Sequence, residues 1–237
     1  MYGWKGKIGL LVPSVNTVVE PETNRMAPEG INIYATRMRN ATVDVENTRD
    51  MLSHLNRAAD ELASAKMDVI AFACTAGSFF EGTSGEQELK TTIERIASAP
   101  AVTTSGAVVK ALRLLHLNKI VVATPYPDDM NNLERKFLVA NGFDALDIKG
   151  LGIVDAWSIG AVTPEETYDF ARKVFSADAD GMFISCTNLR TIEVIERLEK
   201  ETGKPVVTSN QATFWACLRA IRYTETIQGY GKLFENK

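Results

Sequence analysis

The sequence predicts an α/β fold with two pseudo-symmetric lobes, each a four-stranded parallel sheet flanked by helices. Short apolar runs alternate with amphipathic stretches along all 237 residues, which is the pattern of parallel strands joined by crossover helices. Segments of the first half return in the same order in the second half, which indicates a duplicated unit. With 45% hydrophobic and 24% charged residues, the chain has the composition of a globular protein with a sizeable core.

The apolar runs predict strands at residues 8–12, 31–36, 68–73, 101–104, 120–123, 146–151, 181–185 and 206–208. The amphipathic stretches predict helices at 45–65, 85–98, 106–115, 129–141, 164–175, 188–202 and 211–223. The helix at 164–175 has the clearest start, because Thr163 is an N-cap residue, Pro164 fits the first turn, and two acidic residues follow where they favour the helix dipole.

Three pairs of segments carry the repeat. KIGLLVPS at 7–14 matches KIVVATPY at 119–126, and MDVIAFACT at 67–75 matches ADGMFISCT at 179–187, both 112 positions apart. PAVTTS at 100–105 matches PVVTSN at 205–210 with a spacing of 105, as expected where a loop or helix differs in length. We therefore expect an N-terminal lobe at 1–112, a C-terminal lobe at 113–210, and a C-terminal helix and tail at 211–237 that pack back on the first lobe.

Cys74 and Cys186 are the candidate catalytic residues, since the repeat places them at the ends of equivalent strands. Ligands of open parallel sheets bind beyond the carboxyl ends of the strands, so we expect the two thiols to flank one cleft. The backbone N–H groups that follow each cysteine can form a nest that binds an anion and lowers the thiol pKa. A small buried hydrophobic role would explain one such cysteine. For a matched pair, catalysis is the better explanation.

The neighbouring loops supply hydrogen-bond donors for a carboxylate. The expected substrate-binding residues are Ser14, Asn16, Thr75, Ala76, Tyr126, Thr187 and Asn188. Ordinary turn chemistry is the alternative for Ser14 and Asn16, because Asn and Ser favour turns beside Pro13. Arg190, just past the second cysteine, is a further candidate for the carboxylate.

Composition and motifs exclude several classes of function. The net charge of -4 comes from intermixed charges without a basic block, so no nucleic-acid partner is expected, and no apolar run is long enough to cross a membrane. The chain start lacks a signal-peptide pattern, which favours a cytoplasmic protein with free thiols. We expect Cys217 to be a buried core residue on a helix, and His54 and His116 to be structural residues. Without a metal-ligand cluster, GxGxxG or P-loop, no cofactor is expected.

Several segments also carry a family resemblance that runs nearly end to end. IGLLVPSVNT and ATPYPDDMN match substrate-binding loops, FACTAGS and FISCTN match cysteine loops, and SNQATFW with GYGKLFE matches a C-terminal segment. In these motifs the chain resembles the aspartate/glutamate racemase superfamily and, within it, the branch of maleate cis–trans isomerases and arylmalonate decarboxylases. The resemblance implies a two-lobed racemase-like fold, catalysis by Cys74 and Cys186, and carboxylate binding by Asn16 and Tyr126.

Departures from the family patterns bear on the activity. Arylmalonate decarboxylases resemble the chain at Cys186 but have Gly in place of Cys74 and lack the Asn of the first loop. Glutamate racemases usually carry a His after the second cysteine, where Asn188 and Leu189 stand here. Maleate isomerases commonly have an Asn where this chain has Ala156. The paired cysteines and Asn16 therefore favour the maleate isomerase pattern, with the identity of the acid open.

The leading functional hypothesis is a cofactor-independent isomerase of a small carboxylic or dicarboxylic acid. Cys74 would add to an activated double bond, Cys186 would protonate the adjoining carbon, and bond rotation and elimination would follow. The alternative enzymes are a racemase or an arylmalonate-decarboxylase-like enzyme that moves a proton next to a carboxylate. The alternative outside catalysis is a carboxylate-binding protein. A homodimer or higher homo-oligomer is the expected assembly.

Overall fold

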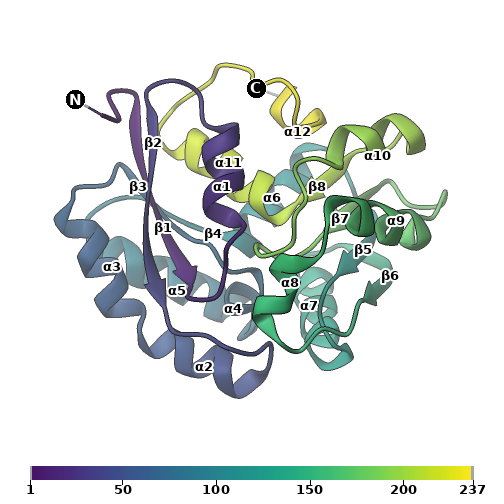
Figure 1. Cartoon of the computed structure of the whole chain (residues 1–237), viewed down its shortest axis with the longest axis horizontal. Coiled ribbons are helices and arrows are strands. Elements are labelled where there is room, and N and C mark those ends of the chain that lie inside the picture. The colour runs from purple at the N-terminus through teal and green to yellow at the C-terminus, as the bar shows by residue number, and fades with distance from the viewer. Residues whose placement is uncertain (1, 236–237) are drawn as a thin grey trace.

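The structure, a computed structural model, describes residues 2–235 and consists of two parallel sheets side by side with helices around them (Figure 1). The first sheet has the order β2-β1-β3-β4 and the second the order β6-β5-β7-β8. The strands are β1 (Gly6–Pro13), β2 (Ile31–Met38), β3 (Val69–Phe72), β4 (Ala101–Thr103), β5 (Lys119–Thr124), β6 (Asp144–Gly150), β7 (Gly181–Ile184) and β8 (Val206–Thr208). All eight expected strands and the α/β fold class are confirmed.

Apart from a register shift between β5 and β6, the two sheets share one register, which confirms the repeat in three dimensions. Ile8 of β1 pairs with Val69 of β3, and the residues 112 positions later, Ile120 and Gly181, pair in the same way. The third pair of segments, which is 105 positions apart, also fits the repeat. β4 pairs with β3 at the same relative positions at which β8 pairs with β7. The inner strands β3 and β7 are buried along their whole length, as strands covered by helices on both faces must be.

The predicted helices occur in the predicted order, but two of them differ from the prediction and four helices, α1, α4, α8 and α12, were not predicted. They are α1 (Val19–Met26), α2 (Val45–Ser53), α3 (Leu55–Ser64), α4 (Thr75–Phe79), α5 (Gly82–Ala97), α6 (Thr104–Leu114), α7 (Asp128–Ala140), α8 (Ala156–Ala161), α9 (Pro164–Val174), α10 (Ile195–Thr202), α11 (Ser209–Ala220) and α12 (Lys232–Glu235). The single helix expected at 45–65 is wrong, because the chain breaks between α2 and α3 at His54.

The helix expected at 188–202 is also wrong in its first half. Only α10 forms, since the N–H groups of Thr191 and Ile192 donate to the Glu22 carboxylate of the other lobe rather than to helical carbonyls. Residues 187–194 are therefore a loop, called here the Cys186 loop. The start of α9 is as expected, with Thr163 and Glu166 forming a capping box.

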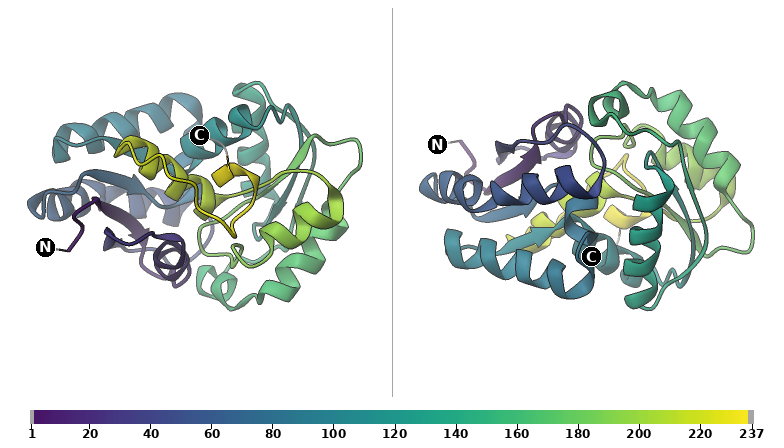
Figure 2. Two further views of the ribbon diagram at one scale, coloured as in Figure 1. Left: turned by 90° about the horizontal axis from the view of Figure 1, so that it is seen from above. Right: turned by 90° about the horizontal axis from the view of Figure 1, so that it is seen from below.

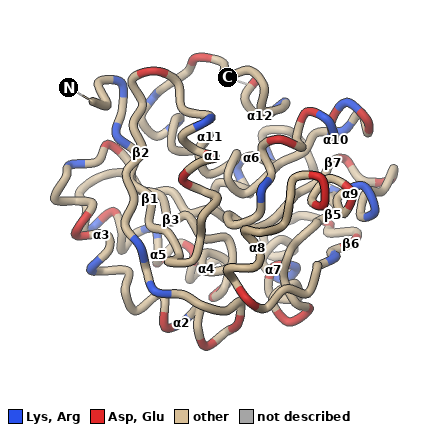
Figure 3. Tube along the Cα trace, in the orientation of Figure 1, with Lys and Arg blue, Asp and Glu red and all other residues tan. Residues whose placement is uncertain are grey.

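The C-terminal helix α11 lies against the first lobe, where it contacts α6, α1 and β3 (Figure 2). Cys217 is completely buried in this helix as part of the core. Charged residues of both signs are intermixed over the chain (Figure 3). Among residues 2–235, no helix has the length and apolar character needed to cross a bilayer.

Candidate active site

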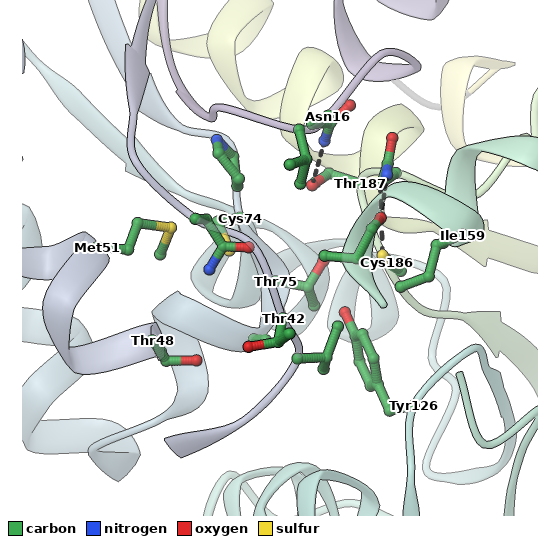
Figure 4. A pocket seen from close by; sticks show the side chains of 17 residues that line it. Asn16, Thr42, Thr48, Met51, Cys74, Thr75, Tyr126, Ile159, Cys186 and Thr187 are labelled. Atoms are coloured by element: carbon green, nitrogen blue, oxygen red, sulfur yellow. Dashed lines mark hydrogen bonds between the residues drawn. The ribbon is translucent and has the colours of Figure 1, made fainter. Parts of the chain in front are cut away.

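A pocket between the two lobes contains both cysteines at the carboxyl ends of their strands (Figure 4). Its wall is made by Pro13, Val15, Asn16, Asn40, Thr42, Val43, Thr48, Met51, Cys74, Thr75, Ala76, Tyr126, Ala156, Ile159, Cys186, Thr187 and Asn188. The first lobe contributes Cys74, two residues past the end of β3, and the second contributes Cys186, two residues past the end of β7. The duplicated fold thus brings one thiol from each half to a single pocket, as the repeat predicts.

Cys74 is the N-cap residue of α4. Its backbone is extended, and its Sγ accepts a hydrogen bond of 3.4 Å from the Gly77 N–H. A side chain at Gly77 would be only 2.9 Å from the Phe72 ring and the Met51 methyl group, so this close approach requires glycine. The cysteine is partly exposed at the pocket surface. Burial of the site raises the pKa of its thiol to about 12, and the Gly77 N–H offsets only part of that effect.

Cys186 has a different local structure. Its φ of 102° is in the left-handed region that favours glycine, so its backbone is strained. Its Sγ accepts the Asn188 N–H at 3.3 Å, and its own N–H donates to the Ser209 hydroxyl at 3.0 Å. Burial raises the thiol pKa to about 11, and the Tyr126 hydroxyl and the Asn188 N–H act in the opposite direction.

The pKa values correct one expectation from the sequence. Backbone N–H groups do reach both sulfur atoms, but burial outweighs them, so both thiol pKa values lie above the ordinary value of 9.0 rather than below it. Both cysteines are therefore predominantly thiols at neutral pH in this state.

Hydrogen bonds interlock the loops of the two lobes around the pocket. The Asn16 side-chain amide donates to the Thr187 hydroxyl at 3.1 Å, and that hydroxyl donates to the Ala73 carbonyl at 3.0 Å. The Asn188 side-chain oxygen accepts the Thr17 N–H at 3.0 Å. Each cysteine loop is thus held by residues of the opposite lobe, which fixes the two thiols relative to one another.

Ser209, the first residue of α11, joins the two cysteine loops. Its hydroxyl accepts the Cys186 N–H and also a hydrogen bond of 2.8 Å from the Thr75 hydroxyl. Ser209 is completely buried. The return of α11 to the first lobe therefore places a shared anchor beneath both cysteine loops.

Eight of the nine expected site residues line the pocket, and Ser14 does not. The Ser14 hydroxyl donates to the Asn40 carbonyl and accepts the Asn40 N–H, both at 3.0 Å, so it holds the loop after β2 instead of facing the pocket. Arg190 lies away from this pocket and lines a separate one with Arg25 and Glu193.

One wall of the pocket was missed by the sequence reasoning. It consists of Asn40, Thr42, Val43, Thr48 and Met51 from the segment after β2, with Ile159 from α8 opposite. The Val43 N–H donates to the Val154 carbonyl at 2.8 Å, so this segment pairs with the chain that leads into α8. A signal was present, because the end of β2 is also the carboxyl end of a strand in the same sheet.

The chain is similar over nearly its whole length to proteins of one known family. The sequence model of the arylmalonate decarboxylase family matches residues 8–234. The chain is 29% identical over 240 residues to a maleate isomerase of Pseudomonas putida, and the match covers 96% of both chains. Solved structures are also similar over nearly the whole chain, among them those of two maleate isomerases.

One is a maleate isomerase variant of Pseudomonas putida S16 with maleate, with a TM-score of 0.91, 26% identity and coverage of 98% of both chains. The other is a maleate cis–trans isomerase mutant of Nocardia farcinica with a covalently bound succinylcysteine intermediate. It has a TM-score of 0.92 and 26% identity, and covers 97% of this chain and 98% of its own.

Proposed function

The chain belongs to the arylmalonate decarboxylase family, and from this premise we propose that it is a cofactor-independent cis–trans isomerase of a small unsaturated dicarboxylate such as maleate. The observation that carries the proposal is the placement of Cys74 and Cys186 in one pocket, one from each lobe. A single cysteine suffices to deliver a proton, whereas an addition and elimination sequence needs a nucleophile and an acid.

In the proposed reaction, Cys74 gives up its proton to solvent water before the reaction begins, and the resulting thiolate adds to one carbon of the double bond. The new C–S bond takes its electron pair from sulfur, and the alkene pair moves to the adjoining carbon as an enediolate. Cys186 protonates that carbon and becomes a thiolate itself. The reacting carbons are then joined by a single bond, which rotates. Return of the proton to Cys186 and departure of the Cys74 thiolate give the trans isomer.

Neutral donors bind the substrate carboxylates in this proposal. Among the residues that the structure describes, the pocket lining includes no Lys, Arg or His. Side chains of Asn16, Thr75, Tyr126 and Asn188, with the N–H groups beside them, are the available donors. Neutral donors leave negative charge on the enediolate only partly compensated, which keeps the addition reversible.

The test follows fumarate by proton NMR after addition of maleate. Cys74→Ala and Cys186→Ala should each abolish turnover. Cys217→Ala should retain it, because Cys217 of α11 is completely buried in the hydrophobic core, away from the pocket. Absence of fumarate at high enzyme concentration would reject maleate as the substrate. Turnover by the Cys74→Ala variant would reject the covalent route.

Decarboxylation of a substituted malonate is the second candidate. It is favoured by the family match and by the apolar part of the wall, Val43, Met51 and Ile159, which suits a bulky substituent. In that reaction Cys186 alone would protonate the carbanion after loss of carbon dioxide. Release of carbon dioxide from a substituted malonate by the Cys74→Ala variant would establish this route. A homodimer and a cytoplasmic location stay predictions.

A further inference from the structure

Two buried glutamates occupy equivalent positions in the two halves of the repeat. Glu22 of α1 and Glu134 of α7 are 112 positions apart, the spacing that also separates Cys74 from Cys186. They are only 4% and 1% exposed. A buried carboxyl group is destabilising unless it has hydrogen-bond partners, so the partners of each glutamate indicate what it does.

Glu134 acts on the residue before Cys186. Its Oε1 accepts a hydrogen bond of 2.7 Å from the Ser185 hydroxyl, and Oε2 has no partner among the described residues. The position equivalent to Ser185 in the first half is Ala73, which has no hydroxyl group. Glu22 therefore cannot hold Cys74 in the way that Glu134 holds Cys186.

Glu22 acts instead across the lobe boundary. Its carboxylate accepts the Thr191 N–H at 2.6 Å, the Ile192 N–H at 3.3 Å and the Asn210 side-chain amide at 2.7 Å. The same Asn210 amide donates to the Thr187 carbonyl at 3.1 Å. Glu22 thus fixes the Cys186 loop, which follows the second cysteine.

The carboxyl groups of Glu22 and Glu134 therefore both hold the segment around Cys186. We propose that Glu22 and Glu134 are positioning residues that together hold the Cys186 segment and assign Cys186 the role of proton donor, leaving Cys74 as the nucleophile. The inference rests on the proposed two-cysteine reaction and adds the origin of its asymmetry. The Cys74 segment depends on neutral partners instead, among them the hydroxyl pair of Ser78 and Ser105 at 2.6 Å.

Above about pH 8, where Glu134 is mostly ionised, its charge opposes a thiolate at Cys186. Burial raises its pKa to about 8, and its ionised form raises the pKa of the Cys186 thiol and of the Tyr126 hydroxyl. The causes that shift the Cys74 pKa do not include Glu134. A thiolate at Cys186 is thus opposed by a neighbour that Cys74 does not have, although stronger net effects of burial keep the pKa of the Cys74 thiol, about 12, above that of the Cys186 thiol, about 11. Burial likewise raises the pKa of Glu22 to about 7.

Several charged groups on the surrounding elements have partners away from Glu134 and Glu22. The helix α7 packs on α4, α5 and β6, and α4 carries no charged side chain. On α5 the ion pair is Lys90 with Glu94, and on β6 it is Lys149 with Asp147. The Glu86 carboxylate of α5 accepts a hydrogen bond from the Thr103 hydroxyl. The Arg135 guanidinium of α7 donates a hydrogen bond to the Ala145 carbonyl. Beside Glu22, Glu193 pairs with Arg25.

The test measures the reactivity of each thiol separately, with iodoacetamide as probe, between pH 7 and pH 10. The full-length Cys74→Ala variant reports Cys186, and the Cys186→Ala variant reports Cys74. Glu134→Gln is introduced into both. We expect it to speed alkylation of Cys186 about three- to tenfold at pH 9, because the anion that opposes its thiolate is gone, and to leave Cys74 unchanged.

Controls separate this effect from a general loss of structure. Glu199→Gln changes another buried glutamate, which binds the Val206 and Lys232 N–H groups away from the cysteines, and should leave both rates unchanged. Ser185→Ala removes the hydroxyl link without changing a charge. It should reduce isomerase turnover through kcat more than through KM.

Equal effects of Glu134→Gln on Cys74 and Cys186, or no effect on Cys186, would overturn the inference. The alkylation rates do not depend on any substrate. If no acid is turned over but Glu134→Gln still speeds only Cys186, the proposed reaction fails while the asymmetry between the thiols stands.

Discussion

The stability of the protein should fall as the pH rises from 5 to 8, and the buried Glu134 carboxyl group should be a main cause. Its pKa is about 8 in the folded protein against an ordinary value of 4.5. Between these values the folded state retains a proton that the unfolded state has released. Glu134→Gln removes this titration while keeping the shape of the side chain.

The magnitude follows from linkage. One additional proton on the folded state lowers the free energy of unfolding by about 1.4 kcal/mol for each unit of rising pH. Over the full interval between the two pKa values the loss is at most about 5 kcal/mol. The wild type and Glu134→Gln should be similarly stable near pH 5, where Glu134 is protonated in the folded state. The variant should be clearly more stable at pH 8.

The assay is urea unfolding of both proteins at half-unit steps from pH 5 to pH 8.5. Glu166→Gln is the control, because the Thr163 N–H and hydroxyl lower the pKa of Glu166, so its titration is complete below this range. The difference in the free energy of unfolding between wild type and Glu166→Gln should therefore stay constant over this pH range. Parallel curves for wild type and Glu134→Gln would refute the reasoning, since they would mean that the Glu134 carboxyl group titrates alike in both states.

Three further predictions concern the site. Because burial keeps both Cys74 and Cys186 as thiols, kcat/KM for maleate should rise about tenfold per pH unit between pH 7 and 9, and a flat profile would contradict the raised thiol pKa values. Ser209→Ala removes the anchor shared by the two cysteine loops, so turnover should fall about tenfold or more while urea unfolding shows a loss of about 1–2 kcal/mol. Gly77→Ala should destabilise the protein by about 1–3 kcal/mol in the same unfolding assay, because the new methyl group has less than 3 Å to the Phe72 ring; unchanged stability would mean that α4 shifts freely.

The sequence was most informative where the structure is repetitive. Equal spacing of the two cysteine strands anticipated the common register of the sheets and the meeting of Cys74 and Cys186 in one pocket. The positions of Asn16, Thr75 and Tyr126 just past the ends of strands likewise predicted that they lie at the pocket. These features depend on local patterns and on the topology of parallel sheets, both of which can be recognised in a single chain.

Contacts between distant segments could not be predicted in this way. The Cys186 loop is a loop because Glu22, 169 positions earlier, accepts the Thr191 N–H. Met51 and Ile159 are pocket residues only because the segments that carry them meet across the lobes, and apolar side chains give no chemical signal of their own. The thiol pKa values likewise depend on burial by both lobes rather than on the residues beside each cysteine.

The left-handed backbone at Cys186 has a consequence for how the protein can change over evolutionary time. Cys74, with a φ of -146°, can be exchanged for many residues without a backbone penalty, whereas at Cys186 glycine is the residue that folding alone would choose. A cysteine persists there against that preference only while its sulfur is useful. Lineages that abandoned the chemistry would be expected to drift toward glycine at this position, and to gain conformational stability as they did so.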